Sequence, residues 1–191
     1  MFVTCLRESL SLGKRVIDFG YGIQLRPFNK QDLTMAFQWR NDSRIWRWTR
    51  QSDLINWEDH LKWFGSIENN PKIKMYMICD EEGSIGVCGL TSIDMIHRHA
   101  EFSLYIDPDK HRRGFATQSL KTLLAHGFEN LGLKSIWGET FEDNPAQFLF
   151  KKIGMKEEGV RREFYFKQGL YWDAILFSML DADYHEENAK W

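Results

Sequence analysis

Two arginines and two small residues lie between a strand pattern and a helix pattern near the middle of the chain. The segment, residues 111–117, reads HRRGFAT. The N-terminus of a helix presents unpaired backbone N–H groups and the positive end of the helix dipole. Small residues there let a phosphate approach the backbone, and arginine side chains add positive charge. The segment is typical of a pyrophosphate-binding turn, although a basic turn that merely opens a core helix can have the same composition.

The elements on either side would hold this turn in place. Before it, Phe102, Leu104 and Ile106 alternate with Glu101, Ser103 and Tyr105, which predicts a strand that Pro108 ends. After it, apolar residues recur at helical spacing and predict one buried helix face: Ala116, Leu120, Leu123, Leu124, Phe128 and Leu131.

The turn resembles motif A of the GNAT acetyltransferases, Gln/Arg-x-x-Gly-x-Gly/Ala. It lacks the Gly-Lys-Ser/Thr end of a Walker loop and the three glycines of a dinucleotide-binding fingerprint. The resemblance implies acetyl-CoA as the cofactor, with its acetyl group and pantetheine arm held by the backbone of Leu104, Tyr105 and Ile106. The pyrophosphate would be held by the turn itself: His111 in the Gln/Arg position, Arg112, Arg113, Gly114, Phe115, Ala116 and Thr117.

A second segment, residues 144–155, resembles motif B of the same family. It begins with Asn144, which the resemblance places against the pantetheine or thioester. Many relatives have a tyrosine in this motif that protonates the departing thiolate. Here Phe150 occupies that position beside the cofactor, and a phenyl ring has no proton to give. Another donor would serve, or the thiolate would leave without one.

The remaining patterns complete a GNAT-like order, β-α-α-β-β-β-α-β-α-β-β. This predicts an α/β fold with a mixed, splayed sheet flanked by helices. Strands are expected at 23–28, 73–79, 85–93, 101–106, 135–140, 155–166 and 171–180, and helices at 31–39, 54–67, after residue 114 and at 144–152. We expect an N-terminal extension of uncertain structure over 1–20, an acetyltransferase domain over 21–183 and a tail over 184–191.

The implied reaction is attack of an amine on a thioester, and the amine must be neutral to attack. Two carboxylates are candidates for the general base: Glu139, on the strand after the basic turn, and Glu101, on the strand before it. Either could instead be paired with a cation. Tyr105 and Tyr165 are possible hydroxyl donors. Two nearby histidines without a third ligand are a weak metal signal, so we expect no metal.

The acceptor pocket would include residues 40–50, which carry four arginines interleaved with two tryptophans. Guanidinium groups bind phosphate, and flat aromatic rings stack on bases or sugars. The acceptor candidates are Arg40, Asn41, Arg44, Trp46 and Arg47. Residues 39–42 (WRND) and the closing stretch over 171–178 resemble the amino-sugar N-acetyltransferases of pseudaminic acid synthesis, which implies a UDP- or dTDP-linked amino sugar. The same features fit the acetyltransferases of ribosomal-protein N-termini, another small amine, a CoA-binding module without catalysis, or plain core packing.

Length and composition limit the number of domains and the classes of partner that the chain can have. The 191 residues suffice for one domain with a substantial core, and the net charge of −2 gives no general case for nucleic acid or membrane binding. Cys79 and Cys88 lie in apolar runs and are expected to be small core residues, which together with the unpatterned Cys5 suggests a reducing cytoplasm. A homodimer is a possible assembly.

Overall fold

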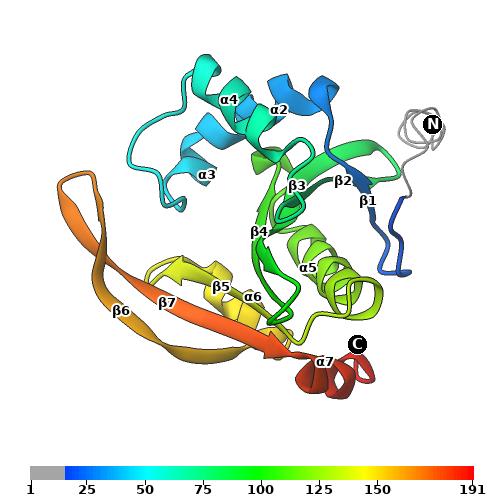
Figure 1. Ribbon diagram of the computed structural model, residues 1–191. Coiled ribbons are helices and arrows are strands. Elements are labelled where there is room, and N and C mark those ends of the chain that lie inside the picture. The colour runs from blue at the N-terminus through cyan, green and yellow to red at the C-terminus, as the bar shows by residue number, and fades with distance from the viewer. Residues whose placement is uncertain (1–15) are drawn as a thin grey trace.

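The computed structural model describes residues 16–191, which form one seven-stranded mixed sheet with helices on both faces (Figure 1). The strand order is β1-β2-β3-β4-β5-β7-β6. The strands are β1 Gln24–Pro27, β2 Lys74–Asp80, β3 Gly83–Asp94, β4 His99–Ile106, β5 Ser135–Phe141, β6 Lys156–Lys167 and β7 Leu170–Leu180. Only β4 and β5 are parallel neighbours, and the other pairs are antiparallel.

The sheet opens between β4 and β5. These strands pair only from His99↔Ser135 to Glu101↔Trp137, whereas β4 pairs with β3 as far as Ile106 and β5 pairs with β7 as far as Phe141. Beyond Glu101, one edge of β4 therefore has no strand partner within residues 16–191. This confirms the predicted splay, and it leaves backbone N–H and C=O groups free to bind an extended ligand.

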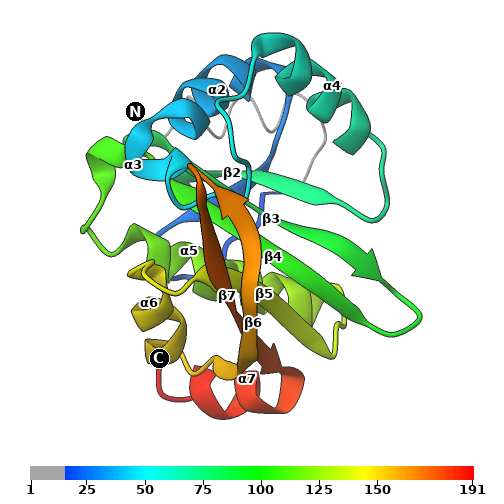
Figure 2. The same ribbon diagram turned by 90° about the vertical axis from the view of Figure 1, so that its left-hand side faces the viewer.

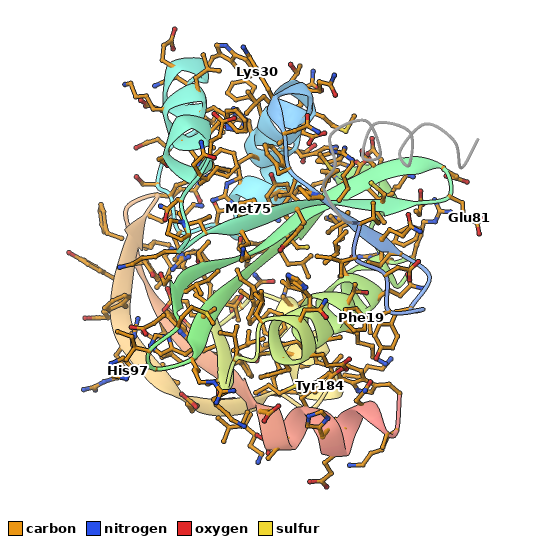
Figure 3. The ribbon with its side chains drawn as sticks, turned by 45° about the vertical axis from the view of Figure 1, so that its right-hand side comes forward. Phe19, Lys30, Met75, Glu81, His97 and Tyr184 are labelled. Atoms are coloured by element: carbon orange, nitrogen blue, oxygen red, sulfur yellow. The ribbon has the colours of Figure 1, made fainter. Side chains whose placement is uncertain are left out.

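Two separate cores lie on the two faces of the sheet. On one face, α5 (Phe115–Ala125) buries Leu120, Leu123 and Leu124 completely against β1, β3 and β4. On the other face, α2 (Leu33–Asn41) and α4 (Trp57–Ile67) pack around Met77 and further residues of β2 and β3. Figure 3 shows Met75 on the α2/α4 side and Tyr184, buried with the α5 core, on the opposite side. Each fully buried leucine contributes about 2 kcal/mol.

Polar residues fix where the helices before β2 begin. Asn29 caps a 3-10 turn (Lys30–Asp32) that runs into α2, Asp42 accepts a hydrogen bond from the Arg44 N–H to begin α3 (Ser43–Trp46), and Asn56 does the same for Asp59 in α4. These closely spaced caps divide the stretch into separate helices. As a result, the loop over residues 47–56 is held between α3 and α4.

The hairpin of β6 and β7 extends away from the rest of the sheet, and its tip returns to α3 (Figure 2). There the Lys167 ammonium donates hydrogen bonds to the carbonyls of Trp46, at 2.5 Å, and Thr49, at 2.8 Å. Burial lowers the pKa of Lys167 to about 8, and the nearby Arg40 adds to this effect. The hairpin and the loop over 47–56 are thus fastened together across the open part of the sheet.

The predicted order of strands is confirmed, and most boundaries fall within two residues of the prediction. The expected helix after residue 114 begins as α5 and continues as a π-helix (His126–Asn130), and its predicted apolar residues Phe128 and Leu131 pack on the same core. The short helices α3 and α7 (Asp181–Asn188) were not expected. The proposed tail boundary at residue 183 falls inside α7, whose Tyr184 is fully buried, and residues 1–15 of the proposed extension lie outside the described residues.

Both cysteines within the described residues are buried, as expected for small core residues. Cys5 lies outside those residues. Within 16–191, no helix combines the length and the apolar character needed to cross a membrane.

Candidate active site

The basic turn lies at the N-terminus of α5, as the sequence predicts. Gly114 precedes the helix with φ of +85°, a left-handed conformation that glycine adopts without strain. A Cβ on this glycine would meet nothing within 4 Å, and no side chain caps the helix. The first turn of α5 therefore presents its N–H groups to open space, as the binding of a pyrophosphate requires.

The side chains of the turn divide into one anchor and two exposed cations. The His111 ring lies 2.9 Å from the Ile106 carbonyl through Nε2, and this contact ties the turn to the end of β4. Arg112 and Arg113 are exposed, and the Arg113 guanidinium lies 5.2 Å from the centre of the Phe115 ring. His111 thus anchors the turn to β4, and the two arginines leave exposed positive charge beside the N-terminus of α5.

The strand residues assigned to the acetyl group and pantetheine arm lie along the open edge of β4. Leu104 packs toward the α5 core and Ile106 is buried in it, whereas Tyr105 faces α2. Burial raises the pKa of the Tyr105 hydroxyl, and the Arg40 guanidinium lies 5.8 Å from the centre of its ring. The edge therefore has one face toward α5 and a second face toward α2 and α4.

The two motif B residues have structural contacts of their own. The Asn144 side-chain oxygen accepts a hydrogen bond from the Ala146 N–H at 2.9 Å, at the start of α6 (Ala146–Lys152). Phe150 is buried, with its ring centre 5.1 Å from that of Phe102 and 5.4 Å from that of Phe177. Phe150 thus lies in the core, next to the strand that borders the splay.

Both candidate bases lie where the sheet begins to open, and one arginine joins them. Arg50 contacts Glu101 Oε1 at 2.7 Å and Glu139 Oε1 at 3.2 Å through its two terminal nitrogens. The Glu101 and Glu139 side chains are only 9% and 2% exposed, whereas that of Arg50 is 49% exposed. Arg50, a loop residue, therefore supplies the positive charge that pairs with both glutamates where β4 and β5 separate.

Two residues of β6 complete the surroundings of Glu139. Arg161 contacts its Oε2 at 3.1 Å, and the Tyr165 hydroxyl donates a hydrogen bond to its Oε1. Burial raises the pKa of Tyr165, and the hydrogen bond to Glu139 raises it further, which keeps this tyrosine a donor. Tyr165 was considered from the sequence, whereas Arg50 and Arg161 were not named as site residues. Arg50 lies at the end of the Arg/Trp segment over 40–50, and Arg161 adjoins no motif.

A cavity of about 630 Å³ lies on the α2/α4 side of β3 and β4, next to these glutamates. The charged residues that line it are Arg40, Arg50 and Asp53, and His60 lines it as well. Arg40 donates a hydrogen bond from Nε to Gln51 at 3.2 Å, and within residues 16–191 no carboxylate lies in ion-pair contact with it. Burial lowers the pKa of Arg40. Because no carboxylate among the described residues pairs with it, this guanidinium is an uncompensated charge of the cavity.

The other predicted acceptor residues take different places. Asn41 exchanges two hydrogen bonds with the backbone of Ile55, at 2.9 and 2.8 Å, and so fixes the loop over 47–56. Arg44 is bound by Asp42 and Asp109, and the exposed Arg47 lies against Trp48.

Trp46 lines a neighbouring cavity of about 570 Å³ together with Phe166 and Lys167. The Lys167 ammonium lies 4.4 Å from the centre of a Trp46 ring. Of the five predicted acceptor residues, only Arg40 thus lines the cavity beside the glutamates.

The histidines at the start of β4 do not form a metal centre in the described part of the chain. His97 and His99 have ring centres 6.4 Å apart, and no group of three or more His, Cys, Asp or Glu residues is arranged there to hold an ion.

Comparison with known proteins agrees with this geometry. A family profile described as an acetyltransferase (GNAT) domain matches residues 23–156. The chain belongs to the GNAT acetyltransferase family. It is therefore an N-acetyltransferase, and its acetyl donor is acetyl-CoA, which supplies the acetyl group as a thioester. The basic turn at the N-terminus of α5, called the cradle below, fits the pyrophosphate of this donor.

The similar proteins include acetyltransferases named for spermidine and one named PseH. The spermidine N(1)-acetyltransferase of Escherichia coli K12 is 27% identical over 170 residues, which cover 88% of this chain and 91% of that protein. The acetyltransferase PseH of Campylobacter jejuni is 26% identical over 125 residues, or 64% of this chain and 76% of that protein. The structure of the Vibrio cholerae spermidine N-acetyltransferase in complex with CoA and spermine superposes with a TM-score of 0.82 at 25% identity, covering 86% and 98% of the two chains.

Proposed function

We propose that this N-acetyltransferase modifies the primary amine of an acceptor that also carries an anionic group, with a nucleotide-linked amino sugar as the best match. The observation that carries the proposal is the position of Arg40. A partly buried guanidinium without a carboxylate partner is costly, unless a bound anion compensates it. Arg40 faces a cavity of ligand size that adjoins the two glutamates of the splay.

The surroundings of the cavity support a larger acceptor than a single sugar. The two neighbouring cavities share Ser52, Asp53 and Leu54 in their walls. The second one offers the aromatic rings of Trp46 and Phe166, on which a flat base can stack. An acceptor whose amine lies at the splay and whose phosphates lie near Arg40 would have room for its base at this hairpin tip.

Acetylation of a polyamine is the second candidate, because spermidine acetyltransferases match nearly the whole domain. A polyamine carries several ammonium groups and needs carboxylates along its length. Here Asp53 is the acid lining the cavity, against Arg40 and Arg50, and the glutamates of the splay already have arginine partners. The charge of the cavity thus favours the anionic acceptor.

A thermal-shift experiment at saturating acetyl-CoA separates these functions, because a ligand that binds the folded state raises the unfolding midpoint. The panel consists of UDP- and dTDP-linked amino sugars, spermidine and N-terminal peptides. We expect a further rise with the nucleotide-linked sugars. A rise with spermidine or a peptide, and none with the sugars, would contradict the proposal.

A further inference from the structure

Arg50 occupies the place where the acceptor amine has to come. Its guanidinium contacts Glu101 on β4 and Glu139 on β5, so it spans the two strands where their pairing ends. The attack on a thioester held along the open edge of β4 takes place at this opening. Buried carboxylates form charge-assisted hydrogen bonds with an ammonium group as well as with a guanidinium. The acceptor amine and Arg50 therefore compete for the same partners.

The loop that carries Arg50 is fastened on either side of it. Lys167 binds the Thr49 carbonyl, and Asn41 binds the backbone of Ile55 on both its N–H and C=O. Residues between these points belong to no helix or strand. Arg50 is also half exposed, and it lines the cavity next to Arg40. Its side chain can leave the glutamates for the cavity without any change in the anchored ends of the loop.

We propose that Arg50 determines acceptor specificity by standing in for the acceptor's ammonium group. An amine that displaces Arg50 takes over the pairing with Glu101 and Glu139, and the released guanidinium needs a new anionic partner. An acceptor with a phosphate provides that partner beside Arg40, whereas a plain amine leaves Arg50 uncompensated. That an amine displaces Arg50 follows from the geometry of the splay alone. That a phosphate of the acceptor then binds Arg50 rests on the proposed function.

The test compares Arg50→Gln with the wild type on two acceptors, a nucleotide-linked amino sugar and the same amino sugar without its nucleotide. We expect the substitution to lower KM for the plain amine at least tenfold, since no cation has to be displaced. It should raise KM for the nucleotide-linked sugar at least tenfold, since one anion-binding cation is lost. Arg50→Lys, which keeps the charge, should restore much of the wild-type preference.

Arg162→Gln is the matched control, because Arg162 is an exposed arginine on β6 that contacts neither glutamate in the structure. It should leave both KM values unchanged. If Arg50→Gln changes kcat/KM for both acceptors by the same factor, Arg50 has only a structural role and the inference is overturned. If the wild type does not use the nucleotide-linked sugar but Arg50→Gln gains on the plain amine, displacement is supported and the proposed function fails.

Discussion

Replacing Arg40 by methionine should separate ligand binding from stability. A hydrogen bond to a charged group contributes about 1.5–3 kcal/mol, so loss of the Arg40 contact should lower kcat/KM for a nucleotide-linked amino sugar by about 10- to 150-fold. The folded protein loses only the hydrogen bond to Gln51 at 3.2 Å and the contact with the Tyr105 ring at 5.8 Å. It also no longer has to desolvate an unpaired guanidinium. We therefore expect the free energy of unfolding to change by no more than about 1 kcal/mol.

Arg26→Met provides the contrast within the same chain. Arg26 forms a buried bidentate pair with Asp32, with both distances 2.8 Å and side-chain exposures of 5% and 7%. Removal of one partner of a buried pair costs about 3–5 kcal/mol. Denaturant unfolding and steady-state release of CoA thiol should show Arg26→Met destabilised with its acceptor KM unchanged. If Arg40→Met instead loses as much stability as Arg26→Met and keeps its acceptor KM, Arg40 is a structural residue and the reasoning is refuted.

Three further substitutions test other parts of the account. Arg113→Glu should weaken acetyl-CoA binding at least tenfold in a titration, because it reverses a charge at the α5 cradle, and unchanged affinity would disprove that assignment. Glu139→Gln should lower kcat by about 100-fold and alter its pH profile while acetyl-CoA affinity stays similar; full activity would transfer the base role to Glu101 or water. Burial lowers the pKa of His126 to about 4, so between pH 6.5 and 4 the unfolded chain binds a proton that the folded chain does not, and stability falls as the pH falls. Between pH 7 and pH 5, the free energy of unfolding of His126→Phe should therefore fall by about 2 kcal/mol less than that of the wild type. Equal falls, measured by chemical unfolding, would show that His126 is not the source of this pH dependence.

The position of the basic turn could be predicted from the sequence because it depends on local geometry. Gly114 and the arginines beside it lie between a strand and a helix that are neighbours in the chain. The spacing of these residues in the sequence therefore locates the cradle. The splay followed from the resemblance to the family. The pairing that ends at Glu101↔Trp137 confirms it.

The acceptor half could not be predicted in the same way. Glu101, Glu139 and Arg50 come together from β4, β5 and a loop, and Arg161 and Tyr165 come from a hairpin that folds back over them. No spacing in the sequence encodes these contacts. The Arg and Trp pattern over 40–50 pointed to Arg40 and Arg44 alike, and it could not show that Arg44 is bound by aspartates while Arg40 faces a cavity.

The most direct test of the central claim is the ratio of kcat/KM for a nucleotide-linked amino sugar to that for spermidine, measured with the same acetyl-CoA concentration and ionic strength. An active site that combines amine and anion recognition predicts a ratio of at least about 100, the product of two tenfold effects at 1.4 kcal/mol each. A ratio below one, with spermidine as the better acceptor, would contradict the claim that the cations of the cavity select the substrate.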